Sequence, residues 1–343
     1  MDQHAVPRRG LTIPFDGVEL SAHRDLFRHA VAAGFTDLWS SETNGADGLT
    51  PLALAAAWEP AARLGSAILP VHTRGPALLA MSAAAMAEAA PGRFVLGIGA
   101  SSPVIVEQWN SVAFDAPFAR VRDTLRFLRR ALAGEKVDEQ FETFAVRGFR
   151  LGRPPRIAPP ILLAALRPAM IRLGAREADG VITNWLAVED VAKVLAELRG
   201  AEPTGQEGAE PPSRAELAAR IFVCPTEDAD YVRALGRTLI SSYLTVPAYA
   251  DFHRWLGREA QLGPMWQAWA AGDRKKANAL VPDEVVDALI IHGSPKQCQE
   301  HVERYAAAGI DTPILALLPT PELNSAQALA ETITALAPAR DAR

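Results

Sequence analysis

The stretch Arg93–Ser102, RFVLGIGASS, decides how the rest of the chain is interpreted. Its apolar first half is typical of a buried strand, which ends at two glycines followed by small residues. Small side chains let a ligand approach the main chain closely, and free N–H groups can bind an anion. The G-x-G-x-x-G fingerprint of dinucleotide sites is incomplete here, because Ser102 replaces the third glycine and Gly97 lies inside the strand. We therefore reject a nicotinamide site.

Composition indicates a soluble enzyme-sized domain. The 343 residues are 49% hydrophobic and 22% charged, with a net charge of −5, enough for one large α/β domain or two ordinary ones. Acidic and basic residues are interspersed, so we expect neither a nucleic-acid partner nor a membrane-binding face. Residues 1–9 lack the apolar core of a secretory signal, and only Cys224 and Cys298 could form a disulfide. We expect a cytoplasmic protein without disulfides.

Short apolar runs alternate with amphipathic helical patterns along almost the whole chain, in the order typical of parallel α/β folds. The alternation continues to the end without a break, which favours a (β/α)8 TIM barrel over a doubly wound open sheet. The helices are expected over 20–33, 50–63, 76–89 and 118–133. The strands are expected over 11–14, 35–40, 66–71, 93–97, 161–165, 180–183, 219–223 and 312–317.

Three segments interrupt the repeat within what we interpret as a single domain, residues 1–343. Residues 134–160 are rich in turn formers and are expected to form an insertion, such as a hairpin. Residues 200–214 are rich in Pro, Gly and Glu and are expected to form a surface linker. Residues 231–279 are too long for one barrel helix and indicate a helical excursion after the seventh strand. Packing between extra helices is favoured over a substrate lid.

The ends of the expected strands, where a barrel carries its function, contain few titratable side chains. No cluster of histidines, cysteines and carboxylates has metal-ligand spacing, and no G-x-S-x-G motif is present, so we expect no metal. His72 is interpreted as a hydrogen-bonded structural histidine rather than a base. A site of small residues, backbone and apolar surface suits an enzyme whose cofactor supplies the chemistry.

Four blocks, in this order, resemble the bacterial luciferase-like superfamily, and most of all its branch that uses the deazaflavin coenzyme F420. That branch includes methylenetetrahydromethanopterin reductase and the F420-dependent glucose-6-phosphate dehydrogenase. The resemblance covers essentially the whole chain, and the combination is specific although each block alone is not. The blocks are Thr73–Pro76, Gly92–Gly99, Arg122–Leu125 with Leu132–Glu135, and Ala164–Met170 followed by Glu177–Gly180.

The resemblance implies an F420 site at the carboxyl ends of the strands. A non-proline cis peptide is implied in the third strand beneath the deazaflavin ring, at Ser66–Ala67 or at the next bond. Ala67 and Leu69 would back and edge the ring, and the backbone of Ala100 and Ser101 would line it further.

The resemblance also implies where the cofactor phosphate and the substrate would lie. The turn formed by Leu166, Arg167, Ala169 and Met170 would hold the phosphate through N–H groups at a helix start. Trp109, Phe114 and Trp185 could form an apolar substrate wall, although core or dimer packing is the preferred role for each alone.

The chain departs from the family pattern at three strand ends. Glu42-Thr43 stands where relatives carry Asp-His, and Ser102 replaces a glutamate. The phosphate-binding lysine after the sixth strand has no counterpart in residues 184–187. Sugar-phosphate oxidation is therefore not expected. Glu42 is expected to hydrogen-bond the deazaflavin or relay a proton, with a capping or surface carboxylate as the alternative, and Thr43, Ser102 and Trp185 to face the substrate.

The resulting hypothesis is an F420-dependent oxidoreductase that moves a hydride between the deazaflavin and a small organic substrate. Two alternatives stay open at this stage. One is a flavin mononucleotide (FMN) monooxygenase of the same superfamily, and the other is a paralogue that binds F420 without catalysis. The family resemblance further implies a homodimer.

Overall fold

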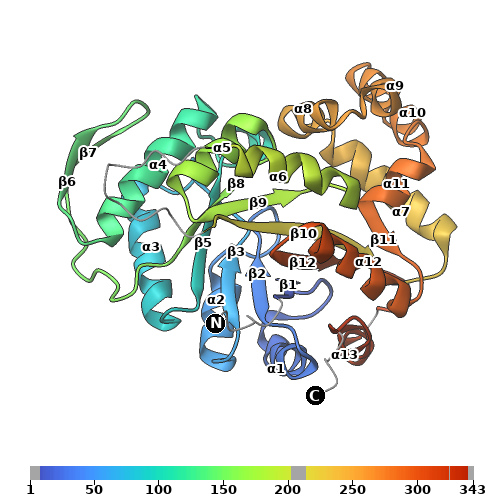
Figure 1. The fold of residues 1–343 in the computed structure, drawn as a ribbon, viewed down its shortest axis with the longest axis horizontal. Coiled ribbons are helices and arrows are strands. Elements are labelled where there is room, and N and C mark those ends of the chain that lie inside the picture. Colours follow the sequence, from blue (N-terminus) through green and yellow to red (C-terminus); the bar gives the residue numbers. More distant parts are fainter. Residues whose placement is uncertain (1–7, 202–213, 324, 339–343) are drawn as a thin grey trace.

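A computed structural model describes residues 8–201, 214–323 and 325–338. Within them eight parallel strands close into a barrel in the order β10-β12-β1-β2-β3-β5-β8-β9 and back to β10 (Figure 1). The predicted (β/α)8 barrel is therefore confirmed. Its strands are β1 (Gly10–Ile13), β2 (Asp37–Ser40), β3 (Arg63–Ser66) with its continuation β4 (Leu69–Pro70), β5 (Phe94–Gly99), β8 (Ile161–Ala164), β9 (Gly180–Asn184), β10 (Glu216–Cys224) and β12 (Thr312–Leu317).

Helices follow the strands and cover the outside of the barrel. Glycines end two of them in the left-handed conformation, Gly34 (φ 117°) and Gly309 (φ 114°), which side chains rarely adopt. The outer helices are α1 (His23–Ala33), α2 (Thr50–Trp58), α3 (Pro76–Ala89), α4 (Pro117–Leu132), α5 (Pro168–Glu177), α6 (Val191–Arg199), α12 (Pro295–Ala308) and α13 (Ala326–Ala335). Helix α3 matches its predicted span. Helix α2 was predicted to end at Arg63 but ends five residues earlier, because β3 begins at Arg63.

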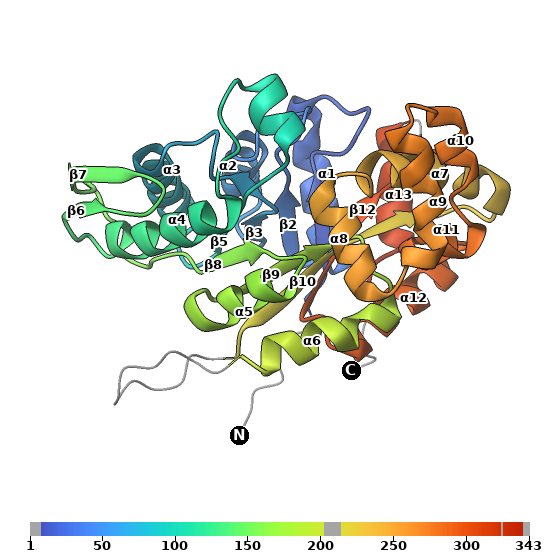
Figure 2. The same cartoon turned by 90° about the horizontal axis from the view of Figure 1, so that it is seen from above.

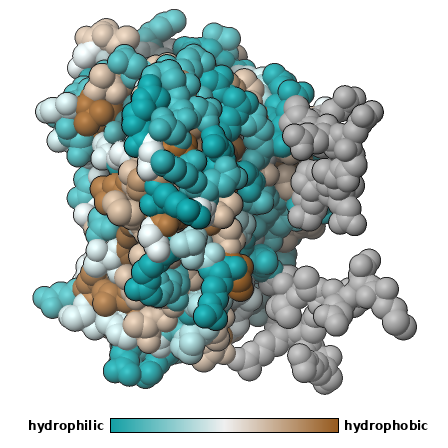
Figure 3. Space-filling view, turned by 90° about the vertical axis from the view of Figure 1, so that its left-hand side faces the viewer, coloured by the Kyte–Doolittle hydropathy of each residue, from teal (hydrophilic) through white to brown (hydrophobic). Residues whose placement is uncertain are grey.

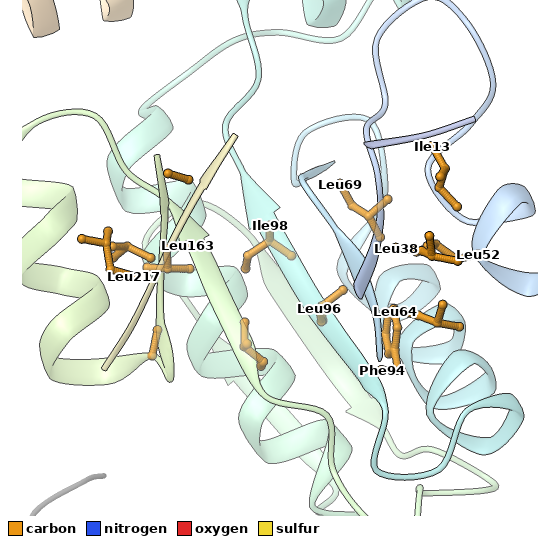
Figure 4. Packing of buried hydrophobic residues seen from close by; sticks show 14 of the residues in the cluster. Ile13, Leu38, Leu52, Leu64, Leu69, Phe94, Leu96, Ile98, Leu163 and Leu217 are labelled. Carbon is orange, nitrogen blue, oxygen red and sulfur yellow. The ribbon is translucent and has the colours of Figure 1, made fainter. Parts of the chain in front are cut away.

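The core has two layers, one inside the barrel and one between the strands and helices. Trp39 fills the barrel floor, since an added Cβ would come within 2.8 Å of its ring at Gly10 and 2.2 Å at Gly65. In the outer layer Leu38 lies beside Leu52 of α2, and Leu64 and Leu96 belong to the same buried cluster (Figure 4). Alternating side chains thus fill both layers, as expected for buried parallel strands.

The predicted insertion at 134–160 contains the antiparallel hairpin of β6 (Val137–Gln140) and β7 (Ala145–Phe149). The excursion after β10 runs further than its predicted end at residue 279. It comprises α7 (Ala229–Tyr243), α8 (Pro247–Leu256), α9 (Glu259–Ala270), α10 (Arg274–Ala279) and α11 (Asp283–Leu289). These helices gather on the side of the barrel opposite the hairpin (Figure 2).

The short strand β11 (Ile290–His292) was not expected from the sequence. It pairs with residues 222–224 of β10, beyond the part that pairs with β9. Most of the predicted linker, residues 202–213 of 200–214, lies outside the described residues. Cys224 and Cys298 are buried free thiols, as predicted. No helix in the described ranges has the length and apolar character needed to span a membrane.

The third strand is broken at the cis peptide that the family resemblance implied, whereas the residue pattern alone predicted a continuous strand over 66–71. β3 leaves the ladder after pairing Gly65 with Val95, and β4 rejoins it where Leu69 pairs with Ile98. A cis peptide bond joins Ala67 to Ile68. This is the second of the two positions proposed for it, and the first position, Ser66–Ala67, is wrong.

Ser66 replaces the missing ladder contacts through its side chain. Its hydroxyl group donates to the carbonyl of Gly97 (3.0 Å) and accepts from the Gly97 N–H (2.9 Å). A Cβ at Gly97 would stand 1.9 Å from the carbonyl oxygen of Ser66, and one at Gly99 would stand 3.1 Å from Ile68. The two glycines of RFVLGIGASS therefore make room for the broken third strand, not directly for a ligand.

Candidate active site

The barrel mouth, meaning the carboxyl ends of the strands and the loops after them, is accessible to solvent. Side chains inside the barrel at the level of Trp39 are buried, whereas those nearer the carboxyl ends keep part of their surface. The partly exposed set comprises Thr12, Ala67, Ile68, Ala100, Ala164, Asn184 and Arg220. Most of these residues are small, and Trp39 closes the barrel below them.

The β3 side of the mouth is apolar. Ala67 and Ile68 pack on the inner core layer and stay partly exposed. Leu69, which was expected to edge the cofactor, is 0% exposed and packs in the outer layer instead. The cis bond and the break in the strand place Ile68, not Leu69, on the accessible side, so the prediction for the Leu69 side chain is corrected.

The loop after β5 presents backbone and small side chains. Ala100, Ser101 and Ser102 are all partly exposed, and Ser101 adopts a positive φ of 68°. The Ser102 hydroxyl accepts a hydrogen bond from the N–H of Ile105 (3.4 Å) at the start of a π-helical turn, Val104–Trp109. Ser102 thus has a local structural role where relatives of the family were expected to carry an acid.

His72 is held by the backbone of two loops. Its Nδ1 lies 3.2 Å from the carbonyl oxygen of Ala100 and its Nε2 lies 3.3 Å from that of Asp115, while the ring packs on Phe114. Burial lowers the pKa of His72, so the ring is neutral near pH 7 and donates to one of the two carbonyls. It is the hydrogen-bonded histidine that the sequence indicated.

The turn between β8 and α5 opens directly into the helix, as the sequence predicted. Pro168 occupies the first helical position, and the N–H of Met170 bonds to the carbonyl of Arg167. The N–H of Ala169 has no backbone carbonyl partner among the described residues, as is usual in a first helical turn. Leu166 and Met170 are partly exposed, and the Arg167 guanidinium binds Asp251 of α8 (3.0 Å).

Glu42 is part of an ion pair. Its carboxylate accepts from Arg74 Nη2 (2.6 Å) and from the backbone N–H of Gly48 (2.8 Å), and both charged side chains are 18% exposed. These contacts tie the loop after β2 to the loop after β4 at the rim of the mouth. Thr43, next to it, is exposed.

The three aromatic residues predicted to form a substrate wall do not lie together at the surface of the mouth. Trp109 is 54% exposed on its turn, and Phe114 covers His72. Trp185 is 1% exposed, with ring centroids 4.1 Å from Phe222 and 5.4 Å from Tyr243. It supports those two rings from behind, so its prediction as a substrate-facing residue is corrected.

Sequence reasoning missed the polar side chains on the β10 side of the mouth. Arg220 of β10 hydrogen-bonds Thr12 of β1 (Nε to Oγ1, 3.4 Å), and Asn184 of β9 donates to the hydroxyl of Tyr249 (3.4 Å). Tyr249 comes from α8 in the helical excursion. One signal was present, because Arg220 interrupts the otherwise apolar run of its strand. Among the described residues no three His, Cys, Asp or Glu side chains are grouped as metal ligands.

A family model described as luciferase-like monooxygenase matches residues 5–312. The chain belongs to the luciferase-like monooxygenase family. This confirms the resemblance seen in the four sequence blocks, and the chain is an enzyme of this family.

Similar proteins include several that are named for coenzyme F420. A Mycobacterium tuberculosis protein, named provisionally as a coenzyme F420-dependent oxidoreductase, is 26% identical over 84% of this chain and 88% of its own length. The 5,10-methylenetetrahydromethanopterin reductase of Methanolobus tindarius is 25% identical over 87% of this chain and 90% of its own. An F420-dependent secondary alcohol dehydrogenase superposes with a TM-score of 0.73 at 16% identity, over 97% of this chain and 99% of its own, which shows a shared fold.

Proposed function

We propose that this enzyme is an F420-dependent oxidoreductase that transfers a hydride between the deazaflavin and a small organic substrate. The observation that carries the proposal is a barrel mouth of small residues, backbone and apolar surface, in a chain similar along 84% of its length to a protein named for F420. When bound, the deazaflavin supplies the hydride chemistry. The protein would bind, orient and shield the reactants.

The residues present fit a planar ring beside the broken third strand. Ala67, Ala100 and Ala164 are small and partly exposed, and Gly99 has no room for a side chain. A flat ring would therefore lie on these small side chains, with Ile68 against one of its faces. At the rim of this side, Arg74 pairs with Glu42 (2.6 Å) and lies 3.7 Å from Asp47.

The start of α5 would hold the phosphate of the cofactor. The N–H of Ala169 and the positive end of the helix favour a negative group there. Arg167, although paired with Asp251, is exposed and can turn toward an added phosphate. Glu42 would act through Arg74 and the two loops it joins, because its carboxylate already accepts three hydrogen bonds.

A cofactor titration tests the proposal. We expect the purified protein to bind F420 in the micromolar range or tighter, measured by the quenching of F420 fluorescence, and to bind FMN at least a hundredfold more weakly. A variant with Ala169→Pro, which removes the free N–H while proline remains tolerated in a first helical turn, should lose most of the F420 affinity. An exposed substitution elsewhere, Gly152→Ala, serves as the matched control.

Each alternative predicts a different result. Tight binding of FMN without binding of F420 would contradict the proposal and support the monooxygenase. Binding of F420 without turnover across a broad panel of carbonyl and unsaturated substrates would support the non-catalytic paralogue. Failure to bind either cofactor would reject both the proposed function and its alternatives.

We also propose that the enzyme is a homodimer that uses the outer face of α3. Leu78 and Met81 are each 49% exposed on one side of this helix, and Phe118 of the neighbouring α4 is 40% exposed. Hydrophobic patches lie among hydrophilic ones on the face that carries α3, α4 and the hairpin (Figure 3). A second copy of the chain would cover this surface.

Sedimentation velocity tests the dimer. We expect a dimer for the native protein and a monomer for the Leu78→Glu/Met81→Glu double variant, because two carboxylates would be buried without partners. Ile157→Glu changes another exposed apolar residue, outside α3, and should stay dimeric. A native monomer at micromolar concentration, or a dimeric double variant, would refute this use of α3.

A further inference from the structure

Arg220 is a charged residue inside the barrel to which the proposed function assigns no role. It is the only arginine or lysine among the inward-facing barrel-strand residues that the structure describes at the mouth. Burial lowers the pKa of its guanidinium, opposed by Tyr243, which also hydrogen-bonds the guanidinium, and by Tyr249 and Asp16. Part of its surface is nevertheless accessible. The group is thus enclosed by protein while facing space that solvent can enter.

Arg220 lacks a carboxylate partner in the described part of the chain. The ion pairs found there, with nitrogen–oxygen distances up to 4.0 Å, do not include it, although most other arginines have one. Its hydrogen-bond partners are hydroxyl groups, those of Thr12 (3.4 Å) and Tyr243. An enclosed guanidinium without an anion is costly, and a bound carboxylate would compensate its charge in two-point geometry.

The surroundings of Arg220 are aromatic. Its guanidinium lies 5.0 Å from the ring centroid of Phe222, and Phe222 is in turn backed by Trp185 at 4.1 Å. Tyr243 and Tyr249 stand edge to face with ring centroids 6.2 Å apart, and Tyr249 is hydrogen-bonded to Asn184. A cation bordered by aromatic rings and hydroxyl groups suits a small planar molecule that carries an anionic group.

The barrel places this group across the mouth from the proposed cofactor surface. β10 and β3 are opposite strands, since β12, β1 and β2 separate them on one side and β9, β8 and β5 on the other. A ring held against Ala67 and Ile68 on β3 would leave its other face toward Arg220. The reacting substrate would enter the space between them.

We propose that Arg220 anchors the carboxylate of the substrate, and that Phe222, Tyr243 and Tyr249 border the planar apolar part of the same molecule. This proposal rests on the proposed function and adds the substrate class, a small aryl or unsaturated carboxylate. The helical excursion then has a direct role at the site, because α7 and α8 supply the two tyrosines.

Calorimetric titration of the F420-loaded enzyme tests the anchor. The probes are benzoate, phenylacetate and 3-phenylpropionate, each compared with its neutral amide. We expect at least one carboxylate to bind ten- to a hundredfold more tightly than its amide, a preference typical of a charge-assisted hydrogen-bonded pair. Arg220→Met should abolish the preference, and Arg220→Lys should keep part of it. Arg153→Met, which removes an exposed arginine, is the control.

The fluorescence titration with F420 separates this proposal from the proposed function. Arg220→Met should bind F420 within about twofold of the native affinity and should melt as cooperatively. Equal binding of acids and amides by the native enzyme, no binding of any acid, or an unchanged preference in Arg220→Met would overturn the anchor while leaving F420 binding intact. A large loss of F420 affinity in Arg220→Met would instead assign Arg220 to the cofactor.

Discussion

The close contact between β3 and β5 makes the substitution Gly97→Ala a strong test of the structure. The added methyl group would stand 1.9 Å from the carbonyl oxygen of Ser66 and 2.7 Å from Ile182 Cδ1. The first of these atoms belongs to the backbone, so no side-chain rotation can relieve the clash. One of the two strands would have to move.

The expected loss in the free energy of unfolding follows from the contacts that such a movement disrupts. Overpacking a well-filled core costs about 1–3 kcal/mol. The shift would also weaken both hydrogen bonds between the Ser66 hydroxyl and Gly97, each contributing about 1 kcal/mol. The sum is about 3–5 kcal/mol. With an unfolding entropy of about 2.1 cal/mol/K per residue, a chain of 343 residues would melt roughly 4–7 °C lower.

Differential scanning calorimetry measures this change. Gly152→Ala is the control, because nothing lies within 4 Å of the added methyl group and its φ is not positive. We expect its midpoint to stay within about 1 °C of the native value. A Gly97→Ala midpoint equally close to native would refute the close approach of Ser66, and with it our explanation of the glycines in RFVLGIGASS.

Three further predictions concern hydrogen bonds and charges. Ser66→Ala should lower the free energy of unfolding by about 1–3 kcal/mol, measured in urea, because the N–H and carbonyl of Gly97 lose their partner. Glu42→Gln and Arg74→Met should show a coupling free energy of about 1 kcal/mol in a double-mutant cycle, whereas additive losses would contradict the ion pair. Burial lowers the pKa of His253 to about 3 from 6.5, so the unfolded chain binds one more proton between these values. Stability should therefore fall as pH decreases below 6.5, by about 2 kcal/mol from this group at pH 5, and His253→Leu should flatten that slope in acid titrations followed by circular dichroism.

Periodicity was sufficient to predict the barrel, because parallel strands buried on both faces produce apolar runs that sequence alone reveals. Glycine and proline marked several helix ends correctly, including the end of α1 at Gly34. The short strand β11 was missed because three residues carry too little pattern. The residue pattern alone did not reveal the break at the cis peptide, which only the family resemblance implied, since the break depends on Ser66 bonding to a residue 31 positions further along the chain.

The candidate site was predictable where its residues follow a strand directly. Ala67, Ala100, Ser101 and the turn before α5 lie at the mouth as expected. Tyr243 and Tyr249 could not be assigned, because their place at the mouth depends on how the helices of the excursion fold back over β10. Sequence also could not show which of two adjacent apolar residues is accessible. Ile68 is partly exposed, whereas Leu69 is buried.

The two sides of the mouth differ in chemistry, and this difference constrains how reactants can be oriented. On the β3 side, Ser66 uses its hydroxyl to satisfy Gly97 while Ala67 and Ile68 face the opening, so that surface offers shape without charge. On the β10 side, Arg220 offers a cation set among aromatic rings. A planar ring would fit the first side, and the carboxylate of a substrate would be stabilised on the second. We therefore expect the cofactor ring and the substrate carboxylate to lie against opposite strands of the barrel.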